Sequence, residues 1–494
     1  MTTTSTSGLS RRLGLVGLAA TGICSMLGAS VYVVPFMIQR NVPGIGPYVL
    51  YAFLFAALPA LLAAFAYALL SSSMPRAGGS YIFASRGLHP YLGFVASFSQ
   101  WFGLSIAIGV ISYIIVPFLR DTAAAMELNE IAESLEMPIV RLILALVLLW
   151  TFVGINIRGL KSYERTLIPL MILMFVLGAV VIFAALHFSH EDFSRELLEH
   201  EGRTIPDQVA SFNFSTFLTA AALLFSSFIG FDSIAQAGGE AKNPSRNLPL
   251  AIAIAILGVG TYYFLFTAAI YQAVPWSFVA EEAMTKDISA PGLLSYLLSP
   301  GWSVLIIGGA AIALINDLPA MLLSVSRLMF AWSEDGIFPK SVSRIHPKNQ
   351  TPVNALILSG VMASIGIMGS HWAGDFFLGI DIMVTSMLVN FLLMCVTVIS
   401  LPKRNPDIAK GMDKLSPRRI QGLIATGGIL LLTLFLFVHI RKDLTAELDA
   451  WYFHSTYAWL IVMGLASLIY VYKIRQMKAA GENIQEKFRN LPKE

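Results

Sequence analysis

The sequence predicts an all-α polytopic membrane protein that crosses the bilayer twelve times. Of its 494 residues, 56% are hydrophobic and only 13% are charged, and the mean hydropathy is +0.71. Soluble globular domains carry about 25% charged residues, so the composition excludes that class. Long apolar stretches recur along the chain, and the polar segments between them alternate in charge. These last two observations set the number of spans and their orientation.

Twelve apolar stretches are long enough, at about 1.5 Å per residue, to cross about 30 Å of hydrocarbon. We expect spans near residues 13–37, 47–73, 92–118, 138–156, 166–187, 213–239, 249–274, 299–332, 353–370, 376–401, 418–440 and 455–473. The first stretch is too long for the apolar region of a cleavable signal peptide, so it is expected to remain as a span.

The connecting loops indicate how the chain is oriented. Lysine and arginine collect in every second loop and in both terminal segments, whereas residues 121–136, 191–201 and 281–282 make the intervening loops acidic. By the positive-inside rule both termini are cytoplasmic. An even number of spans agrees with that placement. We expect a multi-pass protein of the plasma membrane.

The order of the spans predicts two halves and an appended pair. The expected parts are a cytoplasmic N-terminal segment (1–12), a first five-span repeat (13–187), an external loop (188–212), a second, inverted five-span repeat (213–401), spans 11 and 12 (402–473) and a basic cytoplasmic tail (474–494). The external loop is rich in Glu and lacks apolar periodicity, which predicts a solvated linker. The tail is expected to lie as a helix along anionic lipid.

Each half opens with a span that is interrupted near its middle. Small residues break the first span around Gly28, Ala29 and Ser30, with Pro35 following, and Phe225–Ser233 breaks the sixth. Unwound backbone at bilayer depth needs protein, water or a ligand to satisfy its polar groups. Paired interruptions are typical of the binding site of a secondary transporter. The alternative is that the small residues only allow close helix packing.

Two aspartates lie deep within apolar spans, where a carboxylate is costly and usually functional. Asp232 follows the break in span 6, and we expect it to couple transport to a proton. The alternative is an acceptor that ties the broken helix to its neighbours. Asp317 lies near the middle of span 8, beside Asn316 and before Pro319. It is a candidate to meet a substrate amine or a cation; the alternative is a cap for amides freed by Pro319.

Four local patterns together resemble the amino acid–polyamine–organocation transporter family. They are the small-residue break before Pro35, M-P-R-A-G-G-S-Y from Met74 to Tyr81, G-F-D at Gly230–Asp232 with G-E-A-K-N-P-S-R-N-L-P from Gly239 to Pro249, and Ser326-Arg327 followed by E-D-G-I-F-P from Glu334 to Pro339 and H-P-K-N-Q-T-P from His346 to Pro352. They occur in the family's order across most of the first ten spans.

The resemblance implies a ten-helix inverted-repeat core and alternating access around a site between spans 1, 3, 6, 8 and 10. In relatives that carry amino acids, span 1 backbone meets the substrate carboxylate and span 6 carbonyls meet its amine. The implied substrate-binding residues are Ser25, Gly28, Ala29, Ser30, Phe225, Ser226, Ile229 and Asp317. The expected gating residues are Phe228, Phe231 and Trp101, with packing as the alternative for Trp101.

The chain departs from the family pattern in three places. Gly28-Ala29-Ser30 replaces Gly-small-Gly, and Ser226 stands where some relatives place an aromatic gate. No basic residue occurs between Arg165 and His187, so a lysine in span 5 cannot supply the coupling charge.

The sequence therefore predicts a secondary active transporter of amino acids, working by proton-coupled symport or exchange, with sodium less favoured. A polyamine or diamine carrier is the alternative. No enzyme, cofactor, metal or nucleic-acid partner is expected, because no catalytic cluster or G-x-x-x-x-G-K-[ST] loop is present. Membrane lipid is the expected surrounding partner. Substrate identity, transport direction and oligomeric state stay open.

Overall fold

The computed structural model describes residues 9–298, 300–373, 376–447 and 451–492. Within these ranges eleven helices are long and apolar enough to cross a membrane, and Leu15–Met26 is a shorter apolar helix. The prediction of an all-α polytopic membrane protein is confirmed. Residues 1–8 of the predicted N-terminal segment and 493–494 of the predicted tail lie outside the described part of the chain.

The twelve expected spans can be followed along the described helices. They are α1 (Leu15–Met26) with α2 (Ala29–Tyr32) and α3 (Val34–Asn41), α4 (Val49–Ser73), α6 (Pro90–Ala125), α8 (Pro138–Ile157), α9 (Leu160–His187), α11 (Phe214–Leu224) with η2 (Phe225–Phe228) and α12 (Ser233–Gln236), α13 (Pro244–Ala273), α16 (Pro300–Glu334), α17 (Val353–Ala373), α18 (Phe376–Arg404), α20 (Arg418–Thr445) and α21 (Ser455–Ala479). The first expected span is not among the eleven long helices because its break divides it into three short ones.

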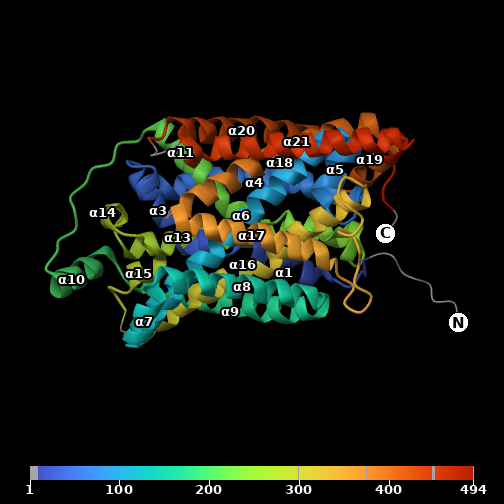
Figure 1. The fold of residues 1–494 in the computed structure, drawn as a ribbon. Helices are drawn as coiled ribbons and strands as arrows, with labels where there is room; N and C mark the ends of the chain where they lie inside the picture. The colour runs from blue at the N-terminus through green and yellow to red at the C-terminus, as the bar shows by residue number, and fades with distance from the viewer. Residues whose placement is uncertain (1–8, 299, 374–375, 448–450, 493–494) are drawn as a thin grey trace.

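The spans form a bundle with a buried centre and two outer layers (Figure 1). α20 and α21 run along one edge of the bundle, and α8 and α9 run along the opposite edge. Between them, α6 packs against α16, α17 and α18, and α13 packs against α4. Of the apolar window of α6, 72% is buried inside the protein, against 17% for α21. The broken spans therefore lie in a protein-lined interior, where irregular backbone is tolerated.

Both ends of the described chain lie at the same end of the bundle, at the right of Figure 1. We call this end the terminal face; α5 (Gly79–Gly87) and α19 (Pro406–Asp413) also lie there. α7 (Asn129–Glu136), α14 (Trp276–Thr285) and α15 (Ala290–Leu294) lie at the other end, which we call the opposite face. Which face is cytoplasmic, and the symmetry of the two repeats, stay predictions.

The loop at residues 188–212, predicted to be external, contains a helix that the sequence analysis did not predict. α10 spans His190–Glu201, and Ser189 and Asp192 form a capping box at its start. Phe193 and Leu197, four residues apart, are fully buried, and the Phe193 ring lies 4.8 Å from that of Phe278 in α14. The expectation of a linker without periodicity was wrong because two apolar residues are enough to dock one short helix.

The end of the C-terminal tail packs on protein, which the sequence analysis did not foresee; the expected contact of the tail with lipid stays a prediction. α21 ends at Ala479, a four-residue helix α22 (Ile484–Lys487) follows, and the Phe488 side chain is buried. Arg86 Nε donates to the carbonyl of Asn490 at 3.2 Å, and Asn405 Nδ2 donates to that of Arg489 at 2.8 Å. The tail therefore covers α5 and the start of α19.

Candidate substrate site at the two broken spans

The first span loses its helix at Leu27 and Gly28. α1 ends at Met26, Leu27 is extended (φ −88°, ψ 93°), and α2 begins at Ala29. The carbonyl of Met26, which has left the helical ladder, accepts a hydrogen bond from the Tyr263 hydroxyl of α13. The side chains of Ala29 and Ser30, both expected in the substrate site, lie outside the described part of the structure; their backbone starts α2.

The sixth span is interrupted between η2 and α12. Ile229 is extended and Gly230 has φ +134°, a conformation that side-chain-bearing residues rarely adopt. A Cβ on Gly230 would collide with the carbonyl of Ser25, so the backbones of the two breaks touch. Ser25 Oγ and Ser233 Oγ share a hydrogen bond of 2.9 Å. The predicted pair of interruptions is thus present, and the two breaks face each other.

Asp232 is fully buried and has two hydrogen-bond donors. Gln100 Nε2 of α6 donates to Oδ2 at 2.5 Å, and the Gly230 amide donates to Oδ1 at 3.1 Å. The contacts continue outward from there: Gln236 Nε2 donates to Gln100 Oε1 at 3.3 Å and to Ser80 Oγ at 2.8 Å. Asp232 therefore connects the broken span to span 3 directly and to α5 through Gln100 and Gln236. This matches the alternative given above for Asp232, an acceptor that ties the broken helix to its neighbours.

The network reaches two further spans. The Tyr67 hydroxyl of α4 shares a hydrogen bond of 2.6 Å with Ser80 Oγ, and Asn390 Nδ2 of α18 donates to Tyr67 at 2.7 Å. The sequence analysis missed Gln100, Tyr67 and Asn390. A signal was available for Gln100 and Asn390, because polar amides inside apolar spans are uncommon and mark interhelical contacts.

Asp317 differs from Asp232 in having no described partner. Its side chain is buried in α16, and within the described residues neither an ion pair nor a hydrogen bond reaches Oδ1. A Cβ on Gly28 would overlap the carboxyl group, so Asp317 lies directly against the break in span 1. Asn316 Nδ2 donates to Cys24 Sγ at 3.0 Å, whereas Asn316 Oδ1 is also without a partner among the described atoms.

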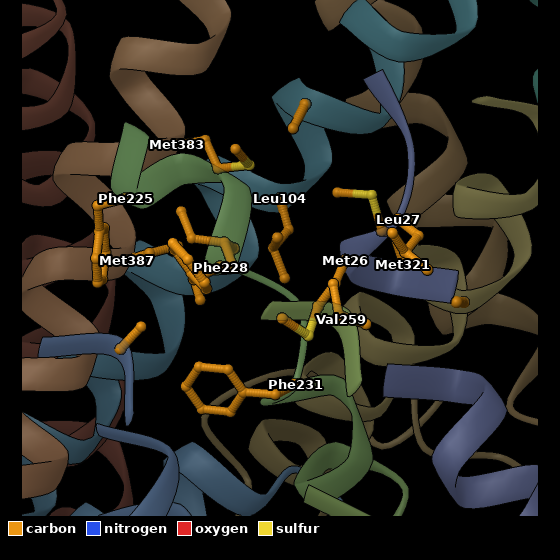
Figure 2. Packing of buried hydrophobic residues seen from close by; sticks show 14 of the residues in the cluster. Met26, Leu27, Leu104, Phe225, Phe228, Phe231, Val259, Met321, Met383 and Met387 are labelled. Carbon is orange, nitrogen blue, oxygen red and sulfur yellow. The ribbon is translucent and has the colours of Figure 1, made fainter. Parts of the chain in front are cut away.

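Apolar side chains surround the two breaks. Figure 2 shows Met26, Leu27, Phe225, Phe228 and Phe231 of the broken spans gathered with Leu104, Val259, Met321, Met383 and Met387. The expected residues Phe225, Phe228, Phe231 and Ile229 are all buried. Phe231 stacks on Phe391 of α18 (ring centroids 5.0 Å apart), and Phe228 lies 5.0 Å from Phe53 of α4. Phe231 and Phe228 thus link span 6 to its neighbours.

Three hydroxyls near this region have no described hydrogen-bond partner. Ser226, predicted in the site, and its neighbour Ser227 are buried in η2, and Ser105 is buried in α6. Buried hydroxyls are usually hydrogen-bonded, so these three are available to bind a polar solute.

Trp101 has its contacts elsewhere. Its Nε1 donates to Ser359 Oγ of α17 at 3.4 Å, and its ring lies 5.2 Å from Phe98 and 5.9 Å from Trp332. The structure therefore groups this residue with spans 8 and 9, and its gating role stays a prediction.

Two buried ion pairs lie at the terminal face. Arg327 binds Glu240 through two hydrogen bonds of 3.0 and 2.6 Å, and Arg86 binds Asp335 through two of 2.5 and 2.9 Å. The Tyr81 hydroxyl also donates to Asp335, at 2.7 Å. The sequence analysis did not foresee either pairing, because the partners come from segments far apart along the chain.

The fold and the site define a class: a multi-span membrane protein whose first and sixth spans break at mid-bundle and meet there. The comparison of sequences supplies the family. The chain belongs to the amino acid permease family, whose model matches residues 13–466. The predicted resemblance to amino acid–polyamine–organocation transporters is thereby confirmed.

The relatives carry different names. The chain is similar to cationic amino acid transporter 4 of Mus musculus, at 28% identity over 81% of this chain and 61% of that protein. It is similar to the branched-chain amino acid permease BcaP of Bacillus subtilis (strain 168), at 26% identity over 87% of this chain and 88% of the permease. It is also similar to the methylthioribose transporter of the same organism, at 26% identity over 81% of this chain and 83% of the transporter. This chain thus spans less than two thirds of the mouse protein.

Proposed function

We propose that this protein is a secondary active transporter of amino acids that works by alternating access around the two breaks. The observation that carries the proposal is the contact between Gly230 and the Ser25–Met26 backbone, which joins two interrupted spans inside the protein. Each interruption frees backbone groups that a polar solute can bind. The names of the relatives support amino acids as the substrate.

The two breaks suit the two charged groups of an amino acid. Free N–H groups at a half-helix start carry partial positive charge, and free C=O groups at a half-helix end carry partial negative charge. In this proposal the carboxylate lies near Gly28, Ala29 and Ser30, and the amine lies near the carbonyls of Phe225 and Ser226. The inverted repeats, the plasma membrane location and the cytoplasmic termini belong to the same proposal.

Counterflow in proteoliposomes tests this function. Purified protein preloaded with unlabelled amino acid should accumulate labelled amino acid from outside, and the initial rate should saturate. Arginine, leucine and putrescine as competitors separate an amino acid carrier from a diamine carrier, which the two buried aspartates Asp232 and Asp317 also suit. The absence of saturable counterflow with every solute would refute the proposal.

Proton coupling at Asp232 is the finer part of the proposal. As a carboxylate, Asp232 accepts from both Gln100 and Gly230. Protonation turns one oxygen into a donor, so one of these two N–H groups loses its acceptor and the broken span loosens from span 3. Proton binding and movement of span 6 would be linked in this way.

Asp232→Asn is expected to abolish the pH dependence of uptake and to spare membrane insertion. In a protein that uses the proton gradient, uptake rates at acidic and neutral external pH differ severalfold; in this variant the ratio should be about one. Asp407→Asn, at a highly exposed carboxylate, is the matched control. Unchanged proton-driven accumulation in Asp232→Asn would exclude the coupling role.

A further inference from the structure

Asp317 has no counterion in the described part of the chain. The helix that carries it packs against α1, α2, α5, α6, α8, α9, α12, α15 and α17, and no described ion pair links any of them to this carboxyl group. Arg86 of α5 is held by Asp335. Span 5, which lies against α16, has no basic residue between Arg165 and His187. Arg327 lies on the same helix about 15 Å away and is held by Glu240. The titratable neighbour is the thiol of Cys24, bound to Asn316.

A buried carboxylate without a partner is unfavourable by several kcal/mol at this depth in a membrane protein. At Asp232 two hydrogen-bond donors offset the unfavourable free energy of burial. Asp317 Oδ1 has no hydrogen-bond donor among the described residues. A partner that offsets this cost is not found among the described side chains. Asn316 Oδ1, on the preceding residue, is a second unsatisfied acceptor in the same part of α16.

The position of Asp317 places its charge at the candidate substrate site. The carboxyl group occupies the space that a side chain at residue 28 would need, so it lies against the break itself. The buried cluster around the two breaks is apolar and contains several methionines, among them Met26, Met321 and Met383 (Figure 2). Methionine side chains adapt to the shape of an aliphatic chain. A carboxyl group beside such apolar side chains suits a substrate that has methylene groups and a terminal cation.

We propose that Asp317 is the counterion for a second cationic group on the substrate, an ammonium or guanidinium at the end of its side chain. The substrate class is then basic amino acids, with Asp317 as the residue that sets the specificity. This inference rests on the proposed function and adds the substrate's charge to it. Pairing with a desolvated ammonium offsets the cost of burying the carboxylate, and a neutral side chain leaves that cost in place.

Lysine and norleucine provide the sharpest test, because the ε-ammonium of lysine is replaced by a methyl group in norleucine. Affinities are measured by counterflow in proteoliposomes and by substrate-induced thermal stabilisation of the purified full chain. The wild type should prefer lysine by at least about tenfold, and Asp317→Asn should reduce that preference to about one. Asp407→Asn, at an exposed pair with Lys410, should keep the wild-type ratio.

The outcomes separate this inference from the proposed function. Absence of any saturable counterflow in the wild type refutes the carrier itself. Saturable norleucine transport without a lysine preference leaves the carrier intact and overturns the role of Asp317, as does an unchanged preference in Asp317→Asn. Tighter binding of putrescine than of lysine would assign the same carboxylate to a diamine. A requirement for sodium that is lost in Asp317→Asn, without a change in the lysine preference, would assign it to an ion and also overturn the inference.

If Asp317→Asn does not fold, the wild-type measurement still tests the substrate class, and a second variant tests the role of Asp317. Gly28→Ala adds a second variant, because its methyl group would occupy the space of the carboxyl group while leaving the charge present. It should weaken lysine binding more than norleucine binding. Equal weakening of both would contradict the contact between Asp317 and the substrate cation.

Discussion

The terminal face and the opposite face of the bundle are held by different kinds of charged contact. At the terminal face, the side chains of Arg327 and Glu240 are 2% and 0% exposed. At the opposite face, Arg40 of α3 binds Asp287 at 2.7 Å, and these side chains are 35% and 85% exposed. Arg203 and Lys286, whose side chains are 37% and 56% exposed, bind the buried Glu282 at 2.6 Å each, so every one of these pairs has an exposed cation.

The C-terminal tail adds a further layer to the terminal face. The Arg86 guanidinium lies 5.2 Å from the centre of the Phe488 ring while it binds Asp335, and Arg76 Nε donates to the carbonyl of Pro492 at 3.0 Å. Two backbone connections also join Leu13 to the end of span 6: Leu13 N donates to Glu240 O and Lys242 N donates to Leu13 O.

This difference indicates which face would open with the smaller expense of free energy in the proposed transport cycle. Exposed ion pairs are screened by water and salt and contribute at most about 1 kcal/mol each. Separating a buried pair leaves two desolvated charges, unless water enters with the movement. Opening of the opposite face therefore needs less free energy than opening of the terminal face. At the terminal face two buried pairs must separate and be hydrated together.

Removal of one buried partner should give the largest effect. Arg327→Ala leaves Glu240 buried without its cation and should lower the free energy of unfolding by about 3–5 kcal/mol. Arg40→Ala at the opposite face is the matched control and should lower it by less than about 1 kcal/mol. Denaturant titration in detergent measures both. Similar losses for the two variants would remove the contrast between the faces.

Phe488→Ala tests the tail and should give an intermediate, local effect. Its ring is buried beneath Arg86, so its loss should reduce the free energy of local opening by about 2 kcal/mol and raise clipping of the tail about thirtyfold. Limited proteolysis under native conditions measures the clipping rate. Gln485→Ala, at an exposed position of α22, should leave it unchanged. A clipping rate in Phe488→Ala equal to that of the wild type would show that the tail is not held there.

Acidification should give the smallest effect, at the opposite face. Burial alone would raise the pKa of Glu282, but hydrogen bonds from Lys286 and Arg203 bring it below its ordinary value of 4.5. A lowered carboxyl pKa contributes stability that is present above the unfolded-state pKa and is lost as the pH falls through the folded-state value.

The difference in melting temperature between wild type and Glu282→Gln should therefore persist from pH 7 to about pH 5, shrink as the pH falls below the ordinary value of 4.5, and disappear below the lowered folded-state pKa. Thermal unfolding in detergent across that range measures it. A difference that grows on acidification would contradict the assigned direction of the pKa shift.

Local features carried most of what the sequence analysis predicted correctly. Gly28 and Gly230 mark the two breaks because a Cβ would collide with the Asp317 carboxyl group at residue 28 and with the carbonyl of Ser25 at residue 230. Gly230 also has a φ of +134°. The apolar lengths of the spans follow from the thickness of the bilayer. α10 was missed because Phe193 and Leu197 are too few to produce a recognisable period.

Non-local contacts account for what the sequence analysis could not predict. Asp232 and Asp317 looked alike as carboxylates inside apolar spans, yet one has two donors and the other has no described partner. The ion pair between Arg86 and Asp335 joins residues 249 positions apart. No local pattern says which cation meets which carboxylate.

The amino-acid sequence by itself determined that the chain lies in a lipid bilayer, how many times it crosses, and where two spans are interrupted. These features are local, because hydropathy and backbone freedom are properties of short segments. The tertiary structure decided which buried charge is compensated. Compensation depends on the few ångströms between side chains on different helices, and packing alone sets those distances.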